Sequence, residues 1–529
     1  MSSFHGRGHG HGFGRGLSRR GLLQGASALG ASALILPAGM RPARAEPQRG
    51  GVLRLGVGHG STSDGLDPGR WDQVFVQMLG ACLHNYLTVV AADGSLAPEV
   101  AESWEATPDA AEWTFQLRRD VEFHDGRPVT AADVAASIDH HRGEDSGSAA
   151  KPIVDQIVEI STDGDHVVIF RLEAGNADFP FLMSDYHLPI MPARDGRVDP
   201  SEGIGCGPYT LDRFDPGVEA NFTRFDGFWK DGHAHFDAVQ ILAIIDPAAR
   251  QNALMSGEVD VIDRVDLNTV HLLERAPGMK VISVPGTQHY VFPMDSRADP
   301  FSDNEVRLAL KYGVDREQML NTILNGYGVV GNDHPIGRSN RFFAEDLEQR
   351  MFDPDRARHH LRNAGLEALR VSLHAADAAF LGAVDASVLF AETAAEAGIR
   401  IDVVREPNDG YWSNVWMQKP FVASYWGGRP TEDWMFSTAY GSGATWNETF
   451  WEHERFNEMM LEARSELDED RRAELYFEMQ RIIRDEGATV IPVFANYVMA
   501  TSDRVMTPDT IGSNTTLDGF RAIERWWFA

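Results

Sequence analysis

A strand–helix–strand pattern between Val371 and Val404 constrains the fold more than any other feature of this chain. Residues 371–373 and 399–404 have the apolar, β-branched character of strands, and residues 386–397 between them have a helical pattern. Gly398 stands where the glycine after a helix C-terminus belongs. Such a unit places its two strands in parallel, so the stretch predicts a parallel sheet with helices on its faces.

Strands and helices alternate along the rest of the chain as well. Strands are expected at residues 51–57, 113–117, 167–170 and 281–284. Helices are expected after the capping residues Thr130 and Asp353, the second of which is followed by a proline. A third helix is expected after Ser302 to Glu305, because Val306, Leu308, Ala309 and Leu310 lie largely on one helical face. A length of 529 residues predicts about three folding units, and no repeat of fixed period is present. We therefore predict an α/β fold in more than one lobe.

The first 45 residues have the pattern of an export signal. A basic, acid-free region ends in Arg19-Arg20, an apolar stretch covers residues 26–36, and Ala43-Arg44-Ala45 is a small-x-small cleavage pattern. The paired arginines before Leu22-Leu23 resemble a twin-arginine signal. A membrane anchor is the alternative, but the apolar stretch is shorter than the ~20 residues that a spanning helix needs. We expect cleavage after Ala45 and a mature protein outside the inner membrane.

Charge and motif content exclude several classes of function. The chain has 48 Lys and Arg against 78 Asp and Glu, a net charge of −30, which disfavours nucleic acid and anionic membrane surfaces as partners. Neither a Gly-x-Ser-x-Gly nor a His-Glu-x-x-His motif is present, so we expect no enzyme, no metal site and no cofactor. The two cysteines, Cys82 and Cys206, are compatible with one disulfide or with two separate buried thiols.

Several motifs resemble one family, in the family's order, over nearly the whole mature chain. The chain is similar to the periplasmic peptide-type solute-binding proteins, extracellular solute-binding family 5, which serve ATP-driven (ABC) importers. The motifs that carry the resemblance are Leu66-Asp67-Pro68, the segments 96–104, 113–118, 121–126 and 128–134, Gly205-Cys206-Gly207-Pro208-Tyr209, Ser256 to Asp260, Pro300 to Asp303, Asp315-Arg316 and 353–365. Most of these residues are expected to be structural, and His124 in particular to be a hydrogen-bonding residue in a turn.

The resemblance implies a two-lobed periplasmic-binding-protein fold with mixed sheets flanked by helices and the ligand between the lobes. Lobe I would comprise residues 46–286 and 498–529, with an extra subdomain at about 88–203, and lobe II residues 287–497. The hinges would lie near residues 288–290 and 494–496. The implied partners are a small-molecule or peptide ligand and an ABC permease with its ATPase, and the protein would be a periplasmic monomer.

The ligand site is expected around Trp426-Gly427-Gly428-Arg429. In peptide-binding members of the family, a Trp-x-x-Asp in lobe II binds the amino group of the ligand, and here Arg429 occupies the position of that aspartate. An arginine repels an ammonium group and suits a carboxylate, phosphate or sulfonate. We therefore expect a peptide or peptide-like solute with an anionic group. Two alternatives stay open: Arg429 could pair with Glu432 or Asp433, and a shift of the alignment could bring one of these acids to the amine-binding position.

Aromatic residues cluster around this motif and suggest apolar walls for the pocket. The candidates are Tyr425, Trp426, Trp434 and Trp446, with His59 and Thr62, in the loop after the first strand, as candidates from lobe I. A metal or metal-chelate (nickel- or heme-type) carrier is the alternative function, because some members of the family bind nickel or heme. An exported hydrolase is the alternative from another class.

Overall fold

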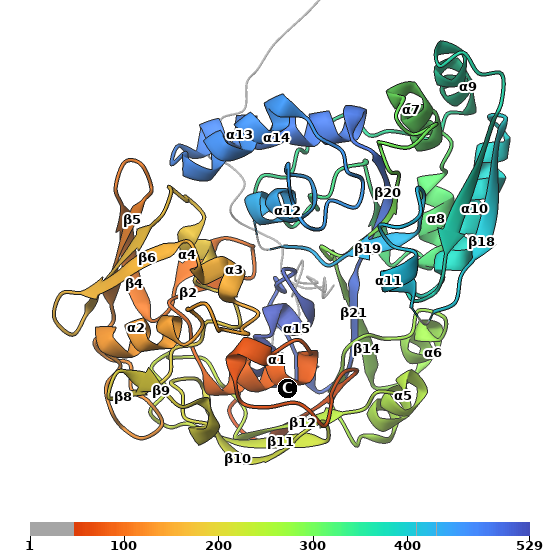
Figure 1. Ribbon diagram of the computed structural model, residues 1–529. Coiled ribbons are helices and arrows are strands. Elements are labelled where there is room, and N and C mark those ends of the chain that lie inside the picture. Colours follow the sequence, from red (N-terminus) through yellow and green to blue (C-terminus); the bar gives the residue numbers. More distant parts are fainter. Residues whose placement is uncertain (1–46, 409, 430) are drawn as a thin grey trace, which may run out of the picture. The chain divides into compact units, whose positions relative to one another are not determined.

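The computed structural model describes residues 47–408, 410–429 and 431–529 (Figure 1). The expected export signal, residues 1–45, lies outside the described residues. In the described part of the chain, no helix combines the length and the apolar character that crossing a membrane requires.

A seven-stranded mixed sheet, with the strand order β10-β11-β12-β1-β13-β21-β14, forms the centre of the first lobe. β1 runs parallel to its neighbours β12 and β13, and the other pairs are antiparallel. The strands are β1 (Val52–Val57), β10 (Tyr209–Asp215), β11 (Glu219–Arg224), β12 (Ala238–Ala243), β13 (Val261–Ile262), β14 (Met279–Val284) and β21 (Tyr497–Ser502). The helices of this region are α1 (Val74–Leu83), α5 (Pro247–Ser256), α6 (Val270–Arg275), α15 (Thr516–Gly519) and α16 (Ala522–Arg525), and β22 (Val505–Met506) pairs with β23 (Trp527–Phe528).

An antiparallel sheet of order β4-β5-β7-β6 has a hydrophobic core of its own and belongs to the same lobe. Its rings Phe115, Phe170 and Phe179 pack edge-on or tilted at 5.3–6.2 Å between centres. Its elements are β2 (Thr88–Val90), β3 (Leu96–Pro98), β4 (Ala101–Ala106), β5 (Glu112–Leu117), α2 (Ala131–Asp139), α3 (Lys151–Val154), β6 (Ile157–Thr162), β7 (Val167–Leu172), α4 (Phe179–Leu182), β8 (Ala193–Arg194) and β9 (Arg197–Val198). The predicted capping box of α2 is confirmed, with Thr130 and Asp133 bonded reciprocally.

The second lobe contains a four-stranded sheet of order β16-β20-β15-β19 and a parallel strand pair, β17-β18. β17 and β18 are joined by α10, which confirms the predicted strand–helix–strand unit, and Gly398 has the positive φ of +79° expected after a helix. The strands are β15 (His289–Pro293), β16 (Gly328–Val330), β17 (Leu369–Ala375), β18 (Ile399–Arg405), β19 (Ser424–Trp426) and β20 (Thr489–Ala495). The helices are α7 (Asn304–Tyr312), α8 (Arg316–Ile323), α9 (Pro354–Asn363), α10 (Ala383–Ala395), α11 (Tyr411–Asn414), α12 (Glu432–Ala439), α13 (Glu454–Ser465) and α14 (Glu469–Glu486).

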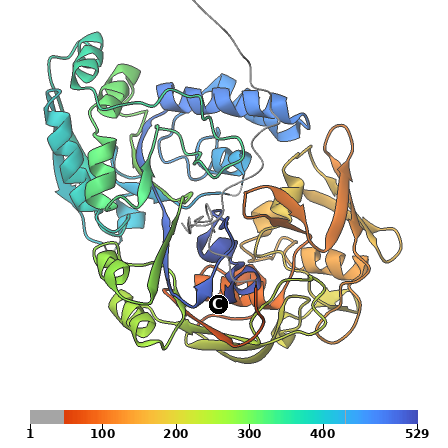
Figure 2. The same ribbon diagram turned by 180° about the vertical axis from the view of Figure 1, so that it is seen from behind.

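The chain crosses between the two lobes twice, at neighbouring points (Figures 1 and 2). β14 leads into β15 through residues 285–288, and β20 leads into β21 through Asn496 alone. β14 pairs with β21 in the first lobe, and β15 pairs with β20 in the second, so the crossings lie side by side. They are tightly packed, because a Cβ on Gly286 would lie 2.2 Å from the Ala495 carbonyl oxygen. The expected hinge residues lie at these crossings.

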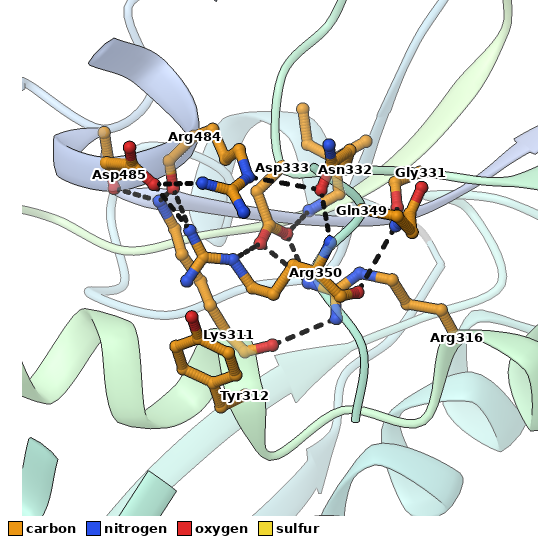
Figure 3. Close-up of polar contacts among 12 residues, drawn as sticks. Lys311, Tyr312, Arg316, Gly331, Asn332, Asp333, Gln349, Arg350, Arg484 and Asp485 are labelled. Atoms are coloured by element: carbon orange, nitrogen blue, oxygen red, sulfur yellow. Dashed lines mark hydrogen bonds and ion pairs between the residues drawn. The ribbon is translucent and has the colours of Figure 1, made fainter. Parts of the chain in front are cut away.

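A buried charge cluster ties α7, α8 and β20 together in the second lobe (Figure 3). Asp333 accepts two hydrogen bonds of 2.7 Å from the Arg316 guanidinium and lies 3.0 Å from Nε of Arg350. It also accepts a hydrogen bond from the backbone N–H of Ile491 in β20. Lys311 donates to three carbonyls at the C-terminal end of α14, and the longest of these bonds is 3.2 Å. All four charged side chains are buried, so the cluster fixes the packing of the lobe.

Two of the sequence motifs pack against each other in the first lobe. His124 Nε2 lies 3.1 Å from the Gly207 carbonyl, and His124 Nδ1 accepts from the N–H of Gly205. This confirms the structural role predicted for His124. Cys82 and Cys206 are both buried free thiols, so the open question of a disulfide is resolved in favour of separate thiols.

Candidate functional site

A cavity of about 860 Å³ lies between the lobes. Its lining comes from α1, from the segment around α3 and residues 184–187, from the loops on either side of α12, and from residues 514–521 near the C-terminus. Arg429, Trp434 and Trp446 are the sequence-predicted site residues that the structure brings together in this lining.

Arg429 follows the last strand residue of β19 by three positions and precedes the N-terminus of α12. Its guanidinium carbon lies 5.9 Å from the ring centre of Trp426 and 6.0 Å from that of Trp434, which suits cation–π attraction. Arg429 Nη1 donates to the Gly427 carbonyl at 3.0 Å, and no carboxylate of the described residues forms an ion pair with it. Burial lowers the pKa of Arg429, and the nearby groups Tyr186 and Asp185 oppose this effect. A cation in a cavity without a paired anion is suited to an anionic ligand.

The two acids that could have neutralised Arg429 have other partners. Glu432 accepts from the N–H of Phe342 at 2.8 Å, and burial raises the pKa of Glu432 to about 7. Asp433 accepts two hydrogen bonds from Arg464, at 3.1 and 3.0 Å, and lines a smaller cavity beside the main one. Both carboxylates are therefore held within the second lobe.

The remaining predicted aromatic residues lie beside the cavity and not in its lining. Trp426 is buried, and its indole N–H donates to the buried carboxylate of Glu448 at 2.7 Å. Tyr425 points the other way along β19, is 39% exposed and packs edge-on against Trp412. The Trp426 ring packs against the cavity-lining ring of Trp446, with 6.1 Å between the ring centres. Trp426 therefore contacts a residue of the lining without belonging to it.

The first-lobe candidates lie in the loop after β1. His59 is half-buried, and burial together with the charges of Arg264 and Arg250 lowers the pKa of His59 to about 4. Thr62 is exposed. Neither residue belongs to the lining of the cavity.

Instead, the first lobe contributes residues that no sequence motif indicated. Asp185, Tyr186 and His187 lie in the loop after α4 and face the cavity. Asp185 Oδ1 accepts from the backbone N–H of His187 at 2.9 Å and lies 2.7 Å from its Nδ1. Burial raises the pKa of Tyr186, and the nearby charge of Asp185 raises it further. A run of loop residues after a four-residue helix has no periodicity that could have predicted this position.

Arg521 also lines the cavity, but its charge is neutralised. Its guanidinium lies 3.1 Å from Glu99 and 3.2 Å from Glu524, and these two acids share Lys230. All three of Arg521, Glu99 and Glu524 are buried. Glu99, in one of the family motifs, therefore holds the cavity-lining residue Arg521, which lies 422 positions later in the sequence.

The C-terminal part of the lining has an unusual backbone. Leu517, Asp518 and Phe520, none of them glycine, have φ values of 53°, 61° and 64°. The Asp518 carboxylate accepts from the N–H of Gly512, from the Trp526 indole and from Arg525. Left-handed residues held by surrounding hydrogen bonds often occur at functional sites, and here they present Phe520 to the cavity.

The arrangement offers charge, hydrogen bonds and aromatic surface to a ligand. No group of three or more His, Cys, Asp or Glu among the described residues has a geometry that could hold a metal ion. The size of the cavity and its mixed aromatic and polar lining are typical of sites for small organic molecules.

Comparisons with known proteins agree with this geometry. The family model described as "Bacterial extracellular solute-binding proteins, family 5 Middle" matches residues 95–448. The dipeptide-binding protein of Escherichia coli (strain K12) is 22% identical over 435 residues, which are 74% of this chain and 80% of that protein.

Solved structures show the same fold. The DppA periplasmic binding protein of Helicobacter pylori, in complex with the peptide STSA, has a TM-score of 0.71 at 18% identity and covers 91% of this chain and 98% of its own. The binding protein AgaA of A. tumefaciens R10, in complex with agropinic acid, has a TM-score of 0.71 at 24% identity and covers 90% of this chain and 99% of its own. The predicted α/β, two-lobed binding-protein fold is confirmed.

Proposed function

Because this chain belongs to family 5 of the bacterial extracellular solute-binding proteins, we propose that it captures a peptide-like solute with an anionic group and delivers it to an ABC importer. The solute binds in the cavity between the lobes, and closure about the two crossings encloses it. Transport energy comes from the separate ATPase, so the binding protein carries out no covalent chemistry.

The observation that carries the proposal is Arg429, a cavity-lining cation whose neighbouring acids are paired elsewhere. Its planar guanidinium can donate two parallel hydrogen bonds to a carboxylate. Trp434 and Trp446 contribute flat apolar surface to the same lining. Dipeptide binding by the Escherichia coli relative and agropinic acid binding by the structural neighbour support a small organic solute of this type.

Three further parts of the proposal concern the whole protein. The export signal is cleaved after Ala45, and the mature protein acts as a periplasmic monomer. Lobe I comprises residues 46–286 and 498–529, with the subdomain at about 88–203, and lobe II comprises residues 287–497. The similarity to transport proteins supports a binding function and no enzymatic activity.

Thermal melting and titration calorimetry of the mature chain with N-acetyl-Ala-Ala, N-acetyl-Ala-Ala-amide and agropinic acid test the proposal. We expect the two carboxylates to bind and raise the melting temperature, and the amide to leave it unchanged. Arg429→Gln should weaken carboxylate binding about 10- to 100-fold, as expected for a lost charge-assisted hydrogen bond. Arg171→Gln, at an exposed ion pair on β7, is the matched control. Equal binding of the acid and its amide, or an unaffected Arg429→Gln variant, would contradict the proposal.

A further inference from the structure

The cavity lining contains two side chains of opposite charge, one from each lobe, that form no ion pair across the cavity. Arg429 belongs to the second lobe and Asp185 to the first, and both line the same cavity. The charge of Asp185 acts to raise the pKa of Arg429, yet the two side chains do not approach within the 4.0 Å of an ion pair in the described structure. Arg521, the other cation of the lining, is neutralised by Glu99 and Glu524.

Asp185 is built to present one carboxylate oxygen to the cavity. The residue is only 8% exposed, so its orientation is fixed by packing. Oδ1 is occupied by the backbone N–H and the Nδ1 of His187, at 2.9 and 2.7 Å. Oδ2 has no hydrogen-bond partner among the described residues. It is also not completely enclosed by protein atoms, so a ligand atom can reach it. A carboxylate oxygen in this position is an acceptor for a donor that arrives in the cavity.

The surroundings of Asp185 favour a cationic donor. Tyr86, Tyr186 and Gln77 belong to the first-lobe part of the lining and are hydrogen-bonding groups without a charge. Asp185 has no Lys or Arg ion-pair partner among the described residues, and its ionisable contact is His187, which carries a charge only when protonated. A bound cation therefore lowers the free-energy cost of burying this carboxylate. The same reasoning applied to Arg429 calls for a bound anion, so one solute with both charges would satisfy both lobes.

We propose that Asp185 is a specificity-determining residue that binds a positively charged nitrogen of the solute, an ammonium or guanidinium group. The inference rests on the proposed function and deepens it: the solute is a zwitterion whose anionic end contacts Arg429 in the second lobe and whose cationic end contacts Asp185 in the first. Such a solute bridges the lobes electrostatically. Its binding therefore favours the closed conformation over the open one, because only the closed form brings both charged residues to the solute.

Titration calorimetry with three matched probes tests the inference: Ala-Ala, N-acetyl-Ala-Ala and Ala-Ala-amide, which are a zwitterion, an anion and a cation. The variant Asp185→Asn keeps an oxygen that can accept from His187 while removing the charge. We expect it to weaken Ala-Ala binding about 10- to 100-fold and N-acetyl-Ala-Ala binding less than about threefold. Asp226→Asn, at a side chain that is 96% exposed, is the matched control and should change neither affinity.

The outcomes separate this inference from the proposed function. If Arg429→Gln abolishes the preference for carboxylates while Asp185→Asn leaves the ratio of Ala-Ala to N-acetyl-Ala-Ala affinity unchanged, the proposed function stands and the role of Asp185 is refuted. An equal loss for both probes in Asp185→Asn would also refute it, since it would indicate a structural effect. If none of the probes binds the wild-type protein, both proposals fail.

Discussion

At the scale of single residues, the structure is organised by buried charges with defined partners. Asp333 is the centre of the second-lobe cluster, with three cationic side chains around it. Although burial alone raises its pKa, the charges of Arg316, Arg350 and Lys311 hold the pKa of Asp333 below its ordinary value. A carboxyl group whose pKa is lower in the folded than in the unfolded state stabilises the fold above its unfolded-state pKa.

Asp333→Asn should therefore destabilise the protein, because it leaves three buried cations without their shared anion. We expect the free energy of unfolding at pH 7 to fall by about 3–5 kcal/mol, measured by urea denaturation. Glu159→Gln, at an exposed ion pair with Arg171, should cost less than about 1 kcal/mol.

The role of Asp333 can also be tested by comparing how the stability of the wild type and of Asp333→Asn depends on pH. The stabilisation from Asp333 is present above about pH 4 and is lost as the pH falls through its folded-state pKa, so wild-type stability should decline in that acidic range. The Asp333→Asn variant should show a shallower decline. Parallel pH profiles for the two proteins would contradict this role of Asp333.

At the scale of elements, two adjacent glycines connect β19 to the loop that carries Arg429. A Cβ on Gly428 would lie 2.0 Å from both Cβ and Oγ1 of Thr287, in the first crossing between the lobes. The Thr287 hydroxyl in turn lies 3.2 Å from that of Tyr497, which lines the cavity. Gly427, by contrast, is exposed, and an added Cβ would meet no atom within 4 Å. The end of β19 therefore needs a glycine at one of these two positions only.

Gly428→Ala should weaken binding of N-acetyl-Ala-Ala by about tenfold or more, because the loop must move away from Thr287 and takes Arg429 with it. Gly427→Ala should remain within about twofold of the wild type. Calorimetric titration of both variants measures the difference. Equal affinities for the two variants would show that the contact with Thr287 does not position the loop.

At the scale of the whole molecule, a second set of contacts joins the lobes away from the crossings. Asp178, which precedes α4 in the first lobe, lies 2.6 Å from Arg472 of α14 in the second, and both side chains are buried. The N–H of Ala177 also donates to the carbonyl of Arg464 at 2.7 Å. These contacts join the two lobes in the described conformation, so they oppose a separation of the lobes.

Asp178→Asn should accelerate dissociation of a bound solute such as agropinic acid by about tenfold and change its association rate little, because this ion pair has to break when the lobes separate to release the solute. Stopped-flow fluorescence of the cavity tryptophans measures both rates. Arg171→Gln again serves as the control, and an unchanged dissociation rate in Asp178→Asn would rule out a role of the pair in holding the lobes closed.

The local elements and the family could both be predicted from the order of the amino acids. The cap residues Thr130, Asp303 and Asp353 each begin a helix, and residues 369–405 form the predicted strand–helix–strand unit. These features depend on residues only a few positions apart. Their capping side chains and their apolar periodicity can therefore be recognised in the sequence. The motifs between residues 66 and 365 likewise indicated the family, because they follow one another along the chain in the family's order, and the family model matches residues 95–448.

The side chains that share the cavity, by contrast, could be identified only from the folded chain. Arg429 could be placed near a pocket from its neighbours in sequence, whereas Asp185 and Arg521 face it from loops that have no motif. The structure alone shows that Arg521 is neutralised by Glu99 and that Glu432 and Asp433 have partners other than Arg429. The physical reason is that the charge of a site depends on ion pairs between residues hundreds of positions apart, which form only when the lobes pack.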